Sequence, residues 1–273
     1  LIEIRFSALE QNLFVLLHSL LLPNVNKETK IYMPTVTKNL IIINVLVYLG
    51  TLVAQSYGID LADYLGLHFF LAKDFNPAQL ITYMFMHGGF THLFFNMFAV
   101  WMFGRILEQV WGPKRFLFYY ILCGIGAGLI SILVTYIRMN ILEAGMSPEA
   151  IATVFQEGLG VLQTNHNYIE PHMASLNLLL NTATVGASGA VYAILLAFGM
   201  LFPNQSLFIF PLPFPIKAKY FVIGYALLEL YSGFANNPND NVAHFAHLGG
   251  MIFGFILIMY WRKKNNNHGT YYN

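Results

Sequence analysis

Long runs of apolar residues, separated by short polar stretches, dominate this chain. Apolar windows of helical length fall at about 39–57, 91–110, 116–137, 186–202, 218–234 and 243–261. A helix needs about 20 mainly apolar residues to cross the hydrocarbon core of a bilayer. The pattern therefore predicts an all-α protein, a polytopic membrane bundle of six transmembrane helices spanning residues 39–262.

The polar stretches between the windows define the connections. The segment 138–180 is the one sizeable polar insertion, and its glutamates indicate an outer loop exposed to water; they are Glu143, Glu149, Glu157 and Glu170. Residues 1–38 precede the bundle, and their apolar run at 13–22 is too short to span a bilayer. We expect a natural start nearer Met33, with an N-terminal extension that is partly non-native, and a cytoplasmic tail at 263–273.

Composition supports the membrane assignment and limits the partners. Apolar residues make up 57% of the chain and charged residues 10%, whereas about a quarter is usual in soluble domains. The lone cysteine, Cys123, cannot form an intrachain disulfide. The net charge of +1 gives no indication of nucleic-acid binding. The expected partners are the lipid bilayer and other membrane proteins, and the sequence does not indicate an oligomeric state.

The distribution of basic residues predicts the orientation. With a cytoplasmic N-terminus, the outer segments hold Lys73 and Arg138, whereas the inner flanks hold Lys27, Lys30, Lys38, Arg105, Lys114, Arg115, Lys217, Lys219, Arg262, Lys263 and Lys264. The positive-inside rule then places both termini in the cytoplasm. We expect the protein in the cell (inner) membrane, with the site opening to the outer face. The second, fourth and sixth windows all run from outside to inside. Their first turns therefore lie at one depth, just below the outer surface.

The fourth window begins with Gly186-Ala187-Ser188-Gly189. A helix N-terminus favours a developing negative charge close to Ser188. The glycines leave room for a backbone or a substrate, and Tyr192 lies on the same helix face. The alternative is a packing ridge of small residues that includes the serine.

The sixth window carries a histidine beside a stripe of small residues. Ala246, Gly250 and Gly254 recur every four residues, so this face can approach another helix closely. His247 lies on the same side, where an imidazole is costly unless it faces the bundle or water. A hydrogen-bonded structural role is the alternative.

The second window supplies a pair of hydrogen-bond donors. His92 and Asn96 are four residues apart and share a helix face. An amide and a ring N–H are both groups that stabilise an oxyanion. Alternatively, they bond to each other or to a neighbouring backbone carbonyl.

Together, a serine, a histidine and a donor pair at one depth indicate an acyl-transfer site. Neither Glu108 nor Glu229 falls in the first turns of these windows, and Asp240 could at most approach His247 from above. We therefore expect a Ser–His dyad, with the imidazole oriented by Tyr192. A metal site or transporter is an alternative, built on His87, His92, His244 and His247. No H-E-x-x-H motif supports it, and we expect neither metal nor cofactor.

These motifs resemble the rhomboid intramembrane serine proteases over roughly residues 39–262. The resemblance rests on G-x-S-G at the fourth window, A-H-x-x-G-x-x-x-G in the sixth, and H-x-x-x-x-H-x-x-x-N leading into the second. It implies hydrolysis of peptide bonds in or near transmembrane segments of other proteins. Ser188 would be the nucleophile and His247 the general base and then acid. A catalytically inactive relative that binds membrane clients is the other hypothesis, but it would be expected to lose one of these two residues.

The resemblance also assigns the supporting residues. The Ser188 backbone N–H, His92 and Asn96 would bind the oxyanion, and Tyr192 would stack on His247. His87 would lie at the outer edge of the site, in a structural or water-binding role. The first outer loop departs from the family, because Ala78-Gln79 stands where many members have a Trp-Arg pair.

Overall fold

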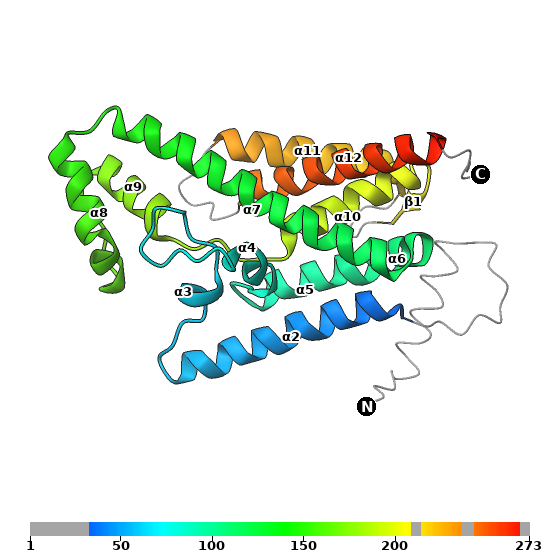
Figure 1. Ribbon diagram of the computed structural model, residues 1–273, viewed down its shortest axis with the longest axis horizontal. Coiled ribbons are helices and arrows are strands. Elements are labelled where there is room, and N and C mark those ends of the chain that lie inside the picture. Colours follow the sequence, from blue (N-terminus) through cyan, green and yellow to red (C-terminus); the bar gives the residue numbers. More distant parts are fainter. Residues whose placement is uncertain (1–32, 209–213, 236–242, 268–273) are drawn as a thin grey trace.

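The computed structural model describes residues 33–208, 214–235 and 243–267 of the chain. Long helices lie side by side in a bundle and run roughly along one direction (Figure 1). In chain order the elements of this bundle are α2 (Thr35–Ser56), α5 (Phe90–Ala99), η2 (Val100–Gly104), α6 (Arg105–Trp111), α7 (Pro113–Glu143), α10 (Ser188–Leu201), α11 (Ala218–Ala235) and α12 (His244–Asn267). The elements α5, η2 and α6 form one continuous helix with a π-helical turn at its centre.

Each apolar window predicted from the sequence coincides with one of these helices. Among the described residues, four helices are long and apolar enough to cross a membrane: α2, the continuous helix 90–111, α7 and α12. The helix α10 is apolar but has only 14 residues, and α11 has 18. A polytopic helical membrane protein is therefore supported, while the count of six spans stays a prediction.

Helix α2 is fixed to the bundle by Glu108 of α6. The first N–H groups of any helix lack partners within the helix. Here Glu108 accepts hydrogen bonds from the backbone N–H groups of Val36 and Thr37, at 2.9 and 2.7 Å, and from the Thr37 hydroxyl at 2.8 Å. Its negative charge also lies at the favourable end of the α2 dipole. This buried carboxylate thus holds α2 against α6.

The segment 138–180, expected as a long loop, is largely helical in the structure. Helix α7 continues to Glu143, and two further helices follow, α8 (Pro148–Gln163) and α9 (Pro171–Asn181). Each of these two helices starts with a proline at its first position. The side chain of Ser147 caps α8 and that of Glu170 caps α9. The two helices pack on each other, and α9 packs on α7, around a small apolar core containing Val154, Leu176 and Leu180. At 1.5 Å per residue α7 is about 46 Å long, which exceeds a hydrocarbon core of about 30 Å, and α8 and α9 lie at one end of the bundle (Figure 1).

The segment between α2 and α5 is ordered around one buried glutamine. It contains the short helices α3 (Ala62–Leu65), α4 (Gln79–Thr82) and η1 (Tyr83–Phe85). The Gln79 side chain accepts from the N–H groups of His68 and Asn76, both at 3.2 Å, and donates to the carbonyls of Tyr64 and Asp74, at 3.3 and 2.8 Å. Gln79 therefore holds together four backbone groups of this loop.

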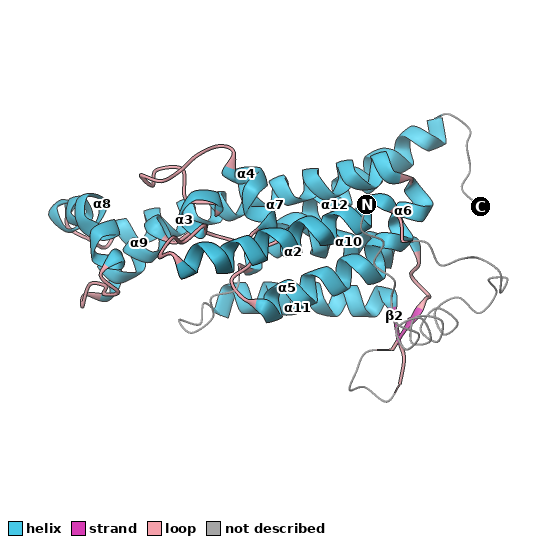
Figure 2. Ribbon diagram, turned by 90° about the horizontal axis from the view of Figure 1, so that it is seen from below, coloured by secondary structure: helices cyan, strands magenta, loops and turns pink. Residues whose placement is uncertain are grey.

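At the opposite end of the bundle, a short antiparallel ribbon precedes α11. It pairs β1 (Ser206–Leu207) with β2 (Ile216–Lys217), and β2 leads directly into α11 (Figure 2).

Candidate active site

The site depends on a close approach of α10 and α12. A methyl group added at Gly250 would overlap the backbone carbonyl of Gly189, and one added at Gly189 would overlap Ala127 of α7. At Gly254 it would meet the hydroxyl of Tyr119. The stripe of small residues predicted from the sequence therefore lies at a helix–helix contact, and this contact brings the first turns of α10 and α12 together.

Ser188 and His247 meet at that contact. The Ser188 Oγ lies 2.8 Å from His247 Nε2, within hydrogen-bond distance. Ser188 is the first residue of α10, and His247 lies in the first turn of α12. The Tyr192 ring stacks on the imidazole with centroids 4.2 Å apart and planes 8° apart. The predicted contacts of these three side chains are thus present in the structure.

Gly186 and His92 complete the neighbourhood of the serine. Gly186 has φ +132°, a conformation that only glycine adopts readily. A Cβ on it would lie 2.8 Å from His92 Cε1 and 3.5 Å from the Ser188 Oγ. The side chains of His92 and Ser188 therefore flank the same small space, and a larger residue at 186 would fill it.

Asn96 lies one turn further along α5. Its Nδ2 donates to the His92 carbonyl at 3.0 Å, which is the backbone bond considered as the alternative to an oxyanion role. A carboxamide nitrogen carries two hydrogens, so this bond leaves one N–H of the buried Asn96 to donate elsewhere.

His87 lies beside His92 at the rim of the site. The two rings are 5.0 Å apart, and His87 is buried. Within the described part of the chain, neither of its ring nitrogens meets a hydrogen-bond partner. Burial, and to a smaller extent the nearby His92, lower the pKa of His87 to about 4, so this ring is neutral at pH 7.

The expectation that no acidic residue reaches the site was wrong. Glu229 of α11 accepts hydrogen bonds from His247 Nδ1 at 2.9 Å and from His244 Nδ1 at 2.7 Å, and also from the Tyr192 hydroxyl. The error came from the direction of α11, which runs opposite to α10 and α12. Its last turns, not its first, lie level with the first turns of those helices, and Glu229 is six residues before Ala235. A lone carboxylate in an apolar helix was the signal, since such a group must face the interior.

The four histidines of the alternative metal site do not gather in one place. His244 and His247 lie with Glu229, and the ligand atoms of these three residues are all within 4.8 Å of one another, a spacing that could hold a metal ion. Their mutual hydrogen bonds also account for the cluster. His87 and His92 form a separate pair.

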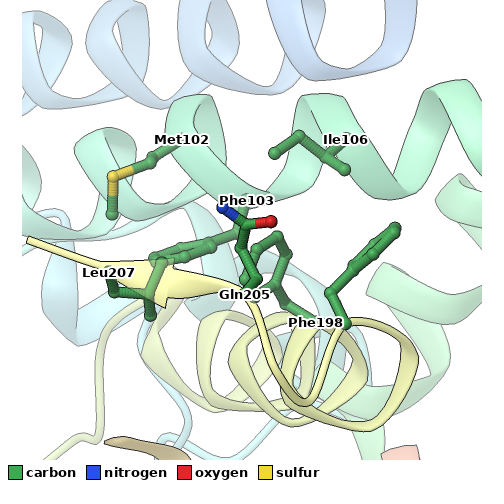
Figure 3. Close-up of a pocket in the computed structure, with 7 residues that line it drawn as sticks. Met102, Phe103, Ile106, Phe198, Gln205 and Leu207 are labelled. Atoms are coloured by element: carbon green, nitrogen blue, oxygen red, sulfur yellow. The ribbon is translucent and has the colours of Figure 1, made fainter. Parts of the chain in front are cut away.

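A small apolar cavity of about 30 Å³ lies between η2, α6, α10 and β1 (Figure 3). Phe103, Phe198 and Leu207 are among its lining residues. It shares no residue with the cluster around Ser188, and its lining carries no ionisable group that could do chemistry.

The fold and the site define a helical membrane protein in which a serine and a histidine from different helices are hydrogen-bonded within the bundle. Residues 75–264 match the model of the Rhomboid domain, so the chain belongs to the rhomboid family. It is 28% identical over 181 residues to the rhomboid protein YdcA of Bacillus subtilis, covering 66% of this chain and 64% of that one. It is 30% identical over 173 residues to RHOMBOID-like protein 12, mitochondrial, of Arabidopsis thaliana, covering 63% and 42%.

A shorter match joins the chain to Rhomboid protease GluP of Bacillus subtilis. It is 38% identical over 53 residues, which are 19% of this chain and 10% of that protein. The chain thus spans less than two thirds of the length of these curated relatives.

Proposed function

We propose that this chain is an intramembrane serine endopeptidase that cleaves peptide bonds in or near transmembrane segments of other membrane proteins. The observation that carries the proposal is the 2.8 Å contact between Ser188 Oγ and His247 Nε2 at the start of two apolar helices. A serine hydroxyl is a weak nucleophile until a neighbouring base takes its proton. The name of the relative Rhomboid protease GluP agrees with this chemistry.

Acylation uses the two residues in sequence. Ser188 Oγ attacks the scissile carbonyl carbon and forms the C–O bond, while its proton passes to His247 Nε2. The tetrahedral intermediate collapses, the C–N bond breaks, and His247 Nε2 gives that proton to the leaving amine. A water molecule then repeats the cycle on the ester, with His247 accepting its proton and returning it to Ser188 Oγ.

The negative charge of the intermediate needs donors that are already in place. The backbone N–H of Ser188 lies at the N-terminus of α10, and His92 flanks the same space as the Ser188 Oγ. The free N–H of Asn96 is the third candidate donor. Gly186 keeps this space open for the oxyanion.

Water must reach the ester inside a membrane, and a shallow site lowers this difficulty. In the proposed topology both termini are cytoplasmic and the site opens toward the outer face, where the neutral ring of His87 can bind the hydrolytic water. A helical substrate hides its carbonyls within its own hydrogen bonds. Substrates with helix-breaking residues near their outer end should therefore be cleaved preferentially.

Cleavage of a model single-span substrate, in detergent or in vesicles, tests the proposal. The Ser188→Ala and His247→Ala variants should lose activity, whereas Ser206→Ala in β1, which lies past the opposite end of α10 from Ser188, should retain it. Equal cleavage by wild type and Ser188→Ala refutes the proposed mechanism. Substrate binding without cleavage by the wild type would instead identify a client-binding relative.

A further inference from the structure

Glu229 is turned toward the interior of the bundle, although most of its helix is apolar and exposed. Its side chain is buried, whereas its neighbours Leu228 and Leu230 are 56% and 43% exposed. A carboxylate within a membrane-embedded bundle is costly unless it is paired. The donors around Glu229 therefore reveal why a carboxylate occupies this position.

Three side chains donate to this carboxylate from two other helices. Oε2 accepts from Nδ1 of both His247 and His244, and Oε1 accepts from the Tyr192 hydroxyl. The bond to His247 is the informative one, because an ionised carboxylate only accepts hydrogen bonds. The proton of neutral His247 must then be on Nδ1, which leaves the Nε2 lone pair facing Ser188 Oγ at 2.8 Å.

We propose that Glu229 is a positioning residue for His247, so that the site functions as a Ser–His–Glu triad assembled from α10, α12 and α11. This inference rests on the proposed function. Glu229 selects the reactive tautomer of the imidazole and holds the ring in place. When His247 accepts the proton of Ser188, the carboxylate stabilises the resulting imidazolium, and the Nδ1 proton remains on the ring.

Tyr192 and His244 make this arrangement rigid. Tyr192 stacks on the face of the His247 ring while its hydroxyl donates to Glu229, so one side chain restrains both members of the pair. His244 lies one turn before His247 on the same face of α12 and donates to the same oxygen, Oε2. The carboxylate is thus fixed in orientation by donors from both helices that carry the reacting groups.

The rate of reaction of Ser188 with a fluorophosphonate probe, measured against pH, tests this role. The titratable groups that face His247 are Glu229, His244, Tyr192 and, from α5, His92. Glu229→Gln removes the one negative charge among them. We expect the maximal rate to fall by about 100-fold or more, and the midpoint of the acid limb to move to lower pH by about one unit or more.

Two further variants separate positioning from a general loss of structure. Glu229→Asp keeps the charge on a shorter side chain, and it should recover part of the rate and return the midpoint toward that of the wild type. Val222→Ala, at another buried position of α11, perturbs packing without touching the cluster, and should leave the midpoint unchanged. A merely structural role for Glu229 would lower the rate at every pH and leave the midpoint where it was.

The outcomes distinguish this inference from the proposed function. A wild type that reacts no faster than Ser188→Ala overturns both. A reactive wild type, together with Glu229→Gln that keeps its midpoint and has a rate within a few-fold of wild type, overturns only the role of Glu229. Loss of rate in both Glu229→Gln and Glu229→Asp with no shift in either midpoint also overturns it.

Discussion

Replacing Gly250 by alanine tests whether the helix contact at the site sets its activity. The added methyl group would overlap the carbonyl oxygen of Gly189, and a backbone atom cannot rotate away as a side chain can. Relief of the overlap requires α10 and α12 to separate by about 1 Å. Overpacking of this kind costs about 1–3 kcal/mol of stability.

The loss of activity should exceed what the loss of stability explains. Gly250 lies one turn from His247, and Gly189 directly follows Ser188, so separation of the helices lengthens the 2.8 Å contact. A misplacement of about 1 Å in a catalytic contact lowers the rate by about 100-fold. We therefore expect Gly250→Ala to remain folded at 25 °C and to cleave a model substrate about 100 times more slowly.

The control is Gly224→Ala in α11, where an added methyl group meets no atom within 4 Å. Alanine in a helix interior is favoured over glycine by about 0.5–1 kcal/mol, so this variant should be at least as stable as the wild type and equally active. Cleavage rates and thermal unfolding in detergent would be measured for all three proteins. Wild-type activity of Gly250→Ala would refute the argument that the close contact sets the geometry of the site.

Three other predictions concern stability, pH and metals. Glu108→Ala leaves the N–H groups of Val36 and Thr37 without their partner, and should lower the free energy of unfolding by about 3 kcal/mol in denaturant titrations. His87 is neutral in the folded state, with a pKa of about 4 against about 6.5 when unfolded. The contribution of His87 to the free energy of unfolding is therefore complete above pH 6.5, and up to about 3 kcal/mol of it is lost as the pH drops to 4. His87→Asn should remove that part of the pH dependence of the unfolding midpoint. A metal chelator should leave cleavage unchanged, and inhibition reversed by added zinc would contradict the assignment of His247 as a proton acceptor.

The sequence predicted the helices well because apolar length alone determines them in a membrane protein. It also predicted the contact of Ser188 with His247, since basic residues set the direction of each window and the direction sets the depth of each residue. The prediction of a loop at 138–180 was wrong because the polar composition of this segment hid two helix caps, Ser147 and Glu170. It also hid the helical spacing of the apolar residues that are buried between α8, α9 and α7.

Glu229 was missed for a different reason. The helix α11 is apolar on nearly all sides, so its pattern does not show which side faces the bundle. The rotation of α11 about its axis is set by the three hydrogen bonds to Glu229, and these join residues 15 to 37 positions apart in the chain. Pairings across helices at such separations follow from tertiary packing, not from any local pattern.

The proposed mechanism requires His247 to activate Ser188 as a nucleophile within the membrane bundle. The most direct test is to treat the detergent-solubilised protein with a fluorophosphonate probe and to locate the adduct by mass spectrometry. We expect a single adduct on Ser188 that is lost in His247→Ala and retained in Ser206→Ala. Absence of an adduct on Ser188 in the folded wild type, or equal labelling of Ser188 in His247→Ala, would contradict it.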